Sequence, residues 1–247
     1  MKIIFIISNV LLIIFNIYFL FSYTNTNTGQ ARSKYTNISY TDEERNNKIK
    51  EIETYLDSIS SSYVEDVQTL AKNNDIPSWG CGPSSYALAK ILNKKFFNNQ
   101  LVIDASYNNN NKYEIIERFS LAQKGNTVGD HAWLEIYMGD KFLFIDPTIG
   151  QFNGIPKIAY EVFNAGDSTI TDSLKQKYGI DDIRLSLLVP KVINRIPAAA
   201  NPYPGVTIDK DYISYFLQVM DYRNQVNDGI EPADWKGWVD TLFEKYK

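Results

Sequence analysis

The chain has 247 residues, of which 44% are hydrophobic and 22% charged, and its net charge is −4. These values are normal for a globular protein with a buried core, and the length suits one domain of good size. No basic stripe is present, which excludes nucleic acid as an expected partner. The chain has one cysteine and one histidine.

The N-terminus differs from the rest of the chain. Lys2 precedes an apolar run over residues 3–21, which is typical of a secretory signal and is also long enough to span a bilayer. We expect a signal peptide or anchor plus spacer over 1–31, with a candidate cleavage site at 29–31, then a linker over 32–42. Residues 43–247 are expected to form a single domain. The expected localisation is secretion or export, and the alternative is membrane anchoring through residues 1–21 if the signal is not cleaved.

Two helices are predicted in the first half of the domain. Thr41 followed by Glu44 resembles a capping box, and apolar residues then keep helical spacing to about Asn73. This segment is either one long helix or two helices broken near residues 60–62. Pro83 suits a first helical turn, so a second helix is expected with Cys81 at or just before its N-terminus.

The remaining elements give a mixed pattern. We expect a short strand at 101–104, a helix over 113–122, a short loop at 149–152 and a modest helix at 171–178. A strand or helical turn is expected at 183–189, a proline-rich connector at 197–204, and helices over 209–226 and 232–246. The predicted fold class is α+β, with an antiparallel sheet packed against the helix that carries the cysteine at its N-terminus, and with added N- and C-terminal helices.

Residues 129–148 are expected to form a β-hairpin around a two-residue Gly139-Asp140 turn, because polar and apolar residues alternate on both sides of it. This turn pairs Met138 with Lys141, and by extension puts Asp146 on the same face as His131 and diagonal to it. Diagonal neighbours lie about 7–8 Å apart at the backbone. A carboxylate aimed at an imidazole fixes the histidine tautomer and supports its charged form.

Cys81 cannot form an internal disulfide, because it is the sole cysteine. A helix N-terminus favours a thiolate, and a nearby imidazole allows a thiolate–imidazolium pair. Gly80 and Gly82 are interpreted as leaving room for a substrate backbone. Each polar residue alone has a plain structural explanation: a buried small residue for Cys81, a structural histidine for His131 and a turn former for Asp146. Together they are more consistent with a nucleophile, a base and an orienting group.

An oxyanion formed at Cys81 would need hydrogen-bond donors. The backbone N–H of Cys81 is one candidate, and the second is left open among Gln151, Trp79 and Asn74. Trp79 and Trp133 are candidates to line the cleft, although core packing is an equal expectation for Trp133. No metal is expected, since one cysteine and one histidine leave two zinc ligands unnamed, and no cofactor is needed.

The motifs also carry a resemblance to a known superfamily. Gly-Cys-Gly-Pro-Ser-Ser at a helix start, then Asp-His-Ala-Trp-Leu-Glu-Ile and Phe-Ile-Asp-Pro-Thr-Ile-Gly-Gln-Phe, resemble the papain-like cysteine enzymes. Within these, the chain looks most like the transglutaminase-like group and related bacterial toxin-type thiol proteases and deamidases. The resemblance covers roughly residues 74–153 and implies Cys81 as nucleophile, His131 as general base and acid, and Asp146 as orienter. Arylamine acetyltransferases share this order of residues.

The expected function is therefore that of an exported thiol hydrolase or acyltransferase acting on a peptide bond or a glutamine side-chain amide of a protein or peptide substrate. Protease, deamidase and transglutaminase-like activities all remain open. One alternative is a catalytically silent transglutaminase-like binding or scaffold module. Another is a membrane-tethered interaction protein that binds through its C-terminal helices.

Overall fold

The computed structural model describes residues 40–74, 76, 79–101, 103–104, 113–124, 127–164, 177, 183–185, 221–222, 224–226 and 228–247. All of them belong to one compact unit, Ile38–Lys247. Within these ranges, no helix combines the length and the apolar character needed to cross a membrane. The predicted signal or anchor, most of the linker and the connector at 197–204 lie outside the described residues, as do nearly all of the helix predicted at 171–178 and most of the one at 209–226.

The first helix, α2 (Asp42–Asn73), is continuous, so the two-helix alternative is wrong. The predicted capping box is confirmed: the Thr41 hydroxyl accepts the Glu44 N–H at 3.2 Å, and the Glu44 carboxylate accepts the Thr41 N–H at 2.7 Å. These two bonds satisfy amides that a helix N-terminus leaves unpaired. The second helix, α3 (Cys81–Phe97), begins after Gly80. The chain ends in a 3₁₀ turn, η2 (Ala233–Trp235), and α8 (Lys236–Tyr246), where the C-terminal helix was predicted.

A mixed sheet forms the other layer, in the order β1-β2-β3-β4-β5 with β6 beside β2. Its central strands β2, β3, β4 and β5 are antiparallel, which confirms the predicted α+β class, and among the described strands only β1 is parallel to its neighbour. The short strand predicted at 101–104 is present as β1, and the segment at 183–189, predicted as a strand or a helical turn, begins with the strand β6. The strands are β1 (Ile103–Asp104), β2 (Tyr113–Lys124), β3 (Thr127–Met138), β4 (Lys141–Asp146), β5 (Ala159–Asn164) and β6 (Ile183–Leu185).

The predicted hairpin is confirmed in both its turn and its register. Met138 pairs with Lys141, and the ladder continues to Leu134 opposite Ile145. Gly139 has a φ of 76°, as the primed hairpin turns require. The ladder between β3 and β4 ends at Leu134, so His131 lies beyond its end on the continuing strand β3.

Two expected elements are wrong. Residues 113–122 form most of strand β2 instead of a helix, because the strand pairs with β3 along all twelve of its residues, Tyr113–Lys124, and its alternate side chains face the helix layer. The short loop expected at 149–152 is instead a four-residue helix, α4 (Gly150–Asn153), which ends at Gly154 in the left-handed conformation. The second difference concerns the site, because α4 carries Gln151, whose amide reaches His131.

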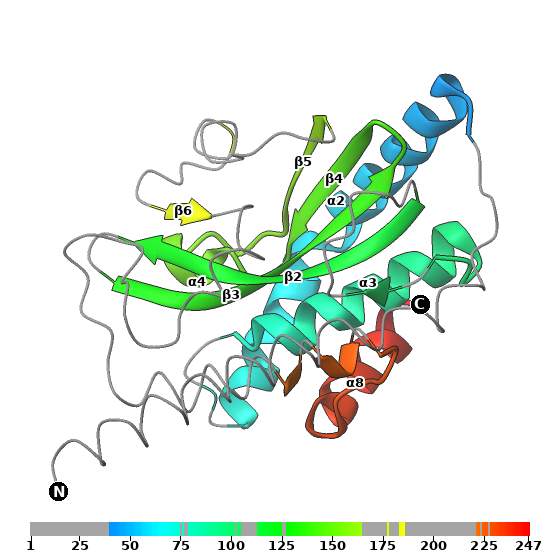
Figure 1. The fold of residues 1–247 in the computed structure, drawn as a ribbon. Helices are drawn as coiled ribbons and strands as arrows, with labels where there is room; N and C mark the ends of the chain where they lie inside the picture. Colours follow the sequence, from blue (N-terminus) through cyan, green and yellow to red (C-terminus); the bar gives the residue numbers. More distant parts are fainter. Residues whose placement is uncertain are drawn as a thin grey trace, which may run out of the picture. The chain divides into compact units, whose positions relative to one another are not determined.

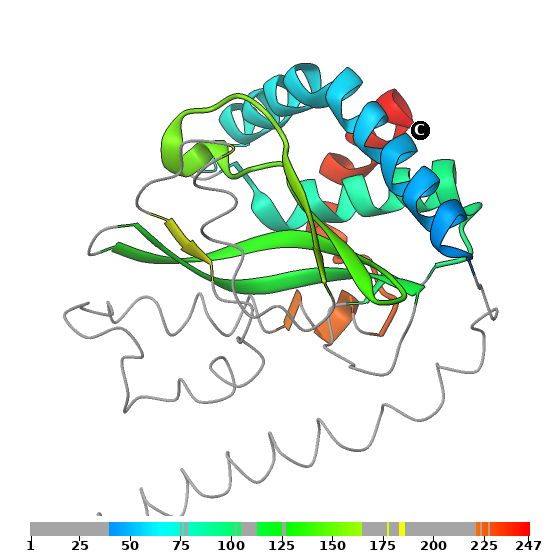
Figure 2. The same ribbon diagram turned by 90° about the horizontal axis from the view of Figure 1, so that it is seen from above.

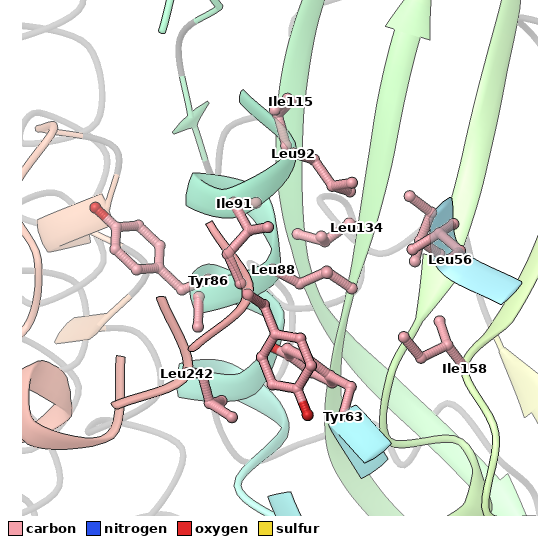
Figure 3. Close-up of a cluster of buried hydrophobic side chains, with 14 of the residues drawn as sticks. Leu56, Tyr63, Tyr86, Leu88, Ile91, Leu92, Ile115, Leu134, Ile158 and Leu242 are labelled. Carbon is pink, nitrogen blue, oxygen red and sulfur yellow. The ribbon is translucent and has the colours of Figure 1, made fainter. Parts of the chain in front are cut away.

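Helices α2, α3 and α8 lie on one side of the sheet (Figures 1 and 2). Alternate sheet residues pack against them, among them Ile115 of β2, Leu134 of β3 and Ile145 of β4. Figure 3 shows Leu88 and Leu92 of α3 in this core beside Leu134 and Ile115. The opposite face of the sheet carries His131, Asp146 and a group of buried side chains, namely Ile116, Trp133, Glu135, Phe142 and Phe144.

Candidate active site

Cys81 is the first residue of α3 and is half-buried. Gly80 precedes it in the left-handed conformation, with φ 55° and ψ 58°, which few residues other than glycine adopt. The Ser84 N–H bonds to the Gly80 carbonyl at 3.0 Å, and the Ser84 hydroxyl bonds to the Trp79 carbonyl at 3.2 Å. These bonds fix the chain entering the helix, and with it the position of Cys81.

The space beside Gly80 and Gly82 is occupied by the C-terminal part of the chain. A Cβ added at Gly80 would lie 2.7 Å from the Trp238 ring, and one added at Gly82 would lie 2.7 Å from the Trp235 ring. The interpretation of these glycines as room for a substrate backbone is therefore wrong. Glycine is needed at both positions because the rings of Trp235 and Trp238 pack against the first turn of α3 and leave no space for a Cβ.

His131 and Asp146 meet as the register predicted. Nε2 of His131 lies 2.6 Å from Oδ2 of Asp146, and both side chains are buried. The second oxygen of Asp146 accepts the N–H of Thr148 at 2.9 Å and its hydroxyl at 3.3 Å. Both carboxylate oxygens are thus used, and the imidazole is held from one side in a fixed orientation.

Cys81 and His131 are brought together by contacts between α3 and β3. The Ser85 hydroxyl, one turn after Cys81, bonds to the carbonyl of Ala132, the residue next to His131, at 3.2 Å. The Cys81 side chain is hydrogen-bonded to His131. The chain thus places Asp146, His131 and Cys81 in contact in that order.

The charge on His131 follows from its neighbours. Burial lowers the pKa of His131, but the charge and hydrogen bond of Asp146, together with the hydrogen bond and charge of Cys81, outweigh burial and raise this pKa to about 10. At neutral pH the ring therefore carries a proton, which both Asp146 and a Cys81 thiolate would stabilise.

Gln151, on α4, reaches the other ring nitrogen. Its amide nitrogen lies 3.0 Å from Nδ1 of His131. An amide N–H can donate to Nδ1 only when the ring is neutral. In the imidazolium form Nδ1–H needs an acceptor, so the amide must turn its oxygen toward the ring or leave Nδ1 to the thiolate. Gln151 and Asp146 therefore contact different nitrogens of the imidazole.

The other residues predicted for the site lie in different surroundings. The Asn74 amide donates to the Leu70 carbonyl at 2.8 Å, so it is engaged at the C-terminus of α2. Trp79 is partly buried, and its ring lies against Gly150, where an added Cβ would be 2.7 Å from it. Trp133 is fully buried and donates its indole N–H to Glu135 at 3.0 Å, which makes it a packing residue under His131 instead of a residue lining an open cleft.

Two residues near the triad were missed in the sequence. Thr148 orients Asp146, and the Asp-Pro-Thr sequence could have indicated it, because aspartate often accepts the N–H two residues later. Glu117 is buried in β2 on the face toward α3, where burial and, to a smaller extent, the charge of Cys81 raise its pKa well above the usual value. No signal pointed to it, since its segment was expected to be a helix. Over the described residues, no cluster of three metal-binding side chains is present.

Comparisons with models of known protein families, with curated proteins and with solved structures found no match.

Proposed function

We propose that the protein is a thiol enzyme of the papain-like, transglutaminase-like kind, in which Cys81 at the start of α3 is the nucleophile. The observation that carries this proposal is the chain of contacts from Asp146 through His131 to Cys81. Because the buried carboxylate of Asp146 occupies Nε2, Nδ1 is the ring nitrogen left to act on the thiol.

The proposed reaction is acyl transfer from an amide. The Cys81 sulfur attacks the carbonyl carbon, and a C–S bond forms. The C–N bond then breaks as the His131 imidazolium gives its proton to the leaving amine or ammonia. A water or an amine, deprotonated by His131, attacks the thioester, and the C–S bond breaks to regenerate the thiolate. Peptide hydrolysis, glutamine deamidation and transamidation differ only in the amide and in the acceptor.

Gln151 is the proposed second oxyanion donor, beside the backbone N–H of Cys81. Its amide nitrogen lies 3.0 Å from Nδ1 of His131, the ring nitrogen that Asp146 leaves to the thiol, whereas the Asn74 amide donates to the end of α2. Replacing Gln151 with alanine should lower acyl transfer by about 10²–10³-fold. The same variant should not slow alkylation of Cys81 by iodoacetamide, because alkylation forms no oxyanion. An equal loss in both reactions would mean that Gln151 affects the reactivity of the Cys81 sulfur and not the stability of the oxyanion.

The direct test uses an activated ester, since it needs no knowledge of the natural substrate. Protein lacking residues 1–31 is mixed with p-nitrophenyl acetate, and p-nitrophenol release is followed together with the intact mass. We expect a burst of one equivalent, an acetyl group on Cys81, no burst in Cys81→Ser and a much slower burst in His131→Ala. Acetylation at the same rate in His131→Ala would overturn the proposal and favour a silent binding module.

The three possible reactions are then distinguished by the product that each one forms. Peptide cleavage, ammonia release from a glutamine peptide and incorporation of a fluorescent primary amine distinguish protease, deamidase and transglutaminase-like activity. Cys81→Ser is the control in each assay. Secretion or export is proposed with the enzyme, and membrane attachment through residues 1–21 is its alternative. The mass of the mature protein from its source would decide between them, because a cleaved signal removes these residues.

A further inference from the structure

Trp238, near the start of α8, lies against the turn of chain that leads into Cys81. Helix α8 packs beside α3 (Figure 1). The six-membered part of the Trp238 ring fills the space next to Gly80, where an added Cβ would lie 2.7 Å from it. The ring itself is buried, and Gly80 directly precedes the cysteine. The C-terminal helix therefore contacts the backbone next to the proposed nucleophile.

The indole N–H of Trp238 begins a chain of hydrogen bonds around this turn. It donates to the Ser84 hydroxyl at 3.1 Å, and that hydroxyl donates to the Trp79 carbonyl at 3.2 Å. The N–H of Ser84 donates to the Gly80 carbonyl at 3.0 Å. Ser84, which is fully buried, thus holds two successive carbonyls before Cys81, and Trp238 holds Ser84.

These bonds determine the direction of the Cys81 N–H. The carbonyl of Gly80 and the N–H of Cys81 belong to one trans peptide unit, so they point in opposite directions. Because the carbonyl is bonded to Ser84 within the first turn of α3, the N–H points away from the helix, which offers it no backbone acceptor. This N–H is the first of the two proposed oxyanion donors.

The sulfur of Cys81 is positioned by other contacts. The Ser85 hydroxyl joins the body of α3 to the carbonyl of Ala132, beside His131. The peptide before Cys81, in contrast, follows Gly80, and glycine adopts positive and negative φ about equally well. A restraint from outside the turn is needed to select one conformation there, and Trp238 supplies it through its ring and its N–H.

We propose that Trp238 is a positioning residue, which holds the Cys81 N–H in the direction of an oxyanion donor by acting through Gly80 and Ser84. This inference rests on the proposed function, because an oxyanion forms only if Cys81 attacks a carbonyl carbon. Loss of the restraint slows acyl transfer but not the intrinsic reactivity of the thiolate. A tryptophan that only stabilised the fold would affect both reactions alike.

The test compares two reactions of Cys81 in the whole chain: acetylation by p-nitrophenyl acetate, which forms an oxyanion, and alkylation by iodoacetamide, which does not. Trp238→Phe removes the indole N–H and shortens the ring beside Gly80. We expect acetylation to slow by about tenfold or more, and alkylation at its plateau pH to change by less than about twofold. Ser84→Ala should give the same separation of the two rates. Trp238→Phe should add little in the Ser84→Ala background, because both act through one chain of bonds.

Leu242→Ala, one turn later on α8, is the control for stability. It removes buried core contacts but no hydrogen bond to Ser84, so both rates should stay near those of wild type in the folded protein. An equal fall of acetylation in Leu242→Ala and Trp238→Phe would overturn the inference, as would an equal fall of acetylation and alkylation in Trp238→Phe. Unchanged acetylation in Trp238→Phe and in Ser84→Ala would overturn it too.

Ser84→Ala keeps the test valid if Trp238→Phe does not fold, because it breaks the same bond from the other end. The failure of the proposed function has a different signature, which is acetylation of Cys81 at the same rate in wild type and in His131→Ala. That result would reject the proposed function and this inference together. A normal loss in His131→Ala, with no effect of Trp238→Phe or Ser84→Ala, would reject the role of Trp238 alone.

Discussion

The two faces of the sheet bury acidic side chains in opposite ways. On the face away from α3, both oxygens of Asp146 have partners in His131 and Thr148, and Glu135 accepts from Trp133 and Tyr137. On the face toward α3, Glu117 has no hydrogen-bond partner among the described residues. A buried acid is tolerated either by donors, which stabilise its charge, or by neutralisation, which avoids it.

The largest expected effect comes from removing Asp146, the hydrogen-bonded acid on the sheet face away from α3. Asp146→Ala leaves His131 without its carboxylate and leaves the N–H and hydroxyl of Thr148 unpaired, so the free energy of unfolding should fall by about 3–5 kcal/mol. Urea denaturation measures this loss. Asp240→Ala is the matched control, because Asp240 forms only an exposed ion pair with Lys236 and its removal should leave stability nearly unchanged. Equal losses in both variants would show that the partners of Asp146 do not stabilise the fold.

A sharper comparison replaces one acid on each face with methionine. Glu117→Met removes a buried group for which the described part of the chain offers no hydrogen-bond partner, so we expect it to raise the free energy of unfolding by about 1–3 kcal/mol. Glu135→Met leaves the indole N–H of Trp133 and the hydroxyl of Tyr137 without their acceptor, and we expect a loss of about 1–3 kcal/mol. Opposite signs in urea denaturation would support the contrast between the faces. A loss in both variants would contradict it.

The pH dependence of stability tests the charge on His131. The pKa of its imidazole is raised from 6.5 to about 10 in the fold. The folded state therefore binds this proton more tightly than the unfolded chain, and its contribution is complete below about pH 6.5 and is lost as pH rises through about 10. We expect the stability difference between wild type and His131→Gln to decrease over that range. A constant difference from pH 6 to 10 would mean that the ring is not charged in the fold.

The smallest expected effect is at the second oxygen of Asp146. Thr148→Val removes one hydroxyl donor at 3.3 Å but keeps the backbone N–H at 2.9 Å, so the loss should be about 0.5–1.5 kcal/mol. Alkylation of Cys81 should slow only slightly, since His131 keeps its partner. A loss as large as that of Asp146→Ala would move the orienting role from the carboxylate to Thr148.

The pairing of Asp146 with His131, on the sheet face away from α3, was predictable from the sequence because both residues belong to one hairpin. A strict alternation around Gly139-Asp140 determines which residues share a face, and this was enough to bring Asp146 to His131. The capping box at Thr41 was predictable for the same reason. Both depend on residues within one turn or one hairpin of each other.

The sheet face toward α3 and the surroundings of Cys81 depend on contacts between segments far apart in the sequence, which the sequence alone does not show. Apolar residues of β2 at positions 113, 116 and 119 fit a helix, and only pairing with β3 shows that Glu117 faces α3. The packing of Trp235 and Trp238 against Gly82 and Gly80 joins segments about 150 residues apart, so glycine was misread as space for substrate. The choice of Gln151 over Asn74 likewise required the position of α4 in the fold.

The measurement that tests the central claim most directly is the rate of Cys81 alkylation by iodoacetamide against pH, in folded wild type and in His131→Ala. If Cys81 and His131 form a thiolate–imidazolium pair, wild-type alkylation should already be near its maximum at mildly acidic pH. In His131→Ala the rise should move to the alkaline range of an ordinary thiol, near pH 8.5. Slow alkylation at neutral pH, or the same profile in both proteins, would contradict the account.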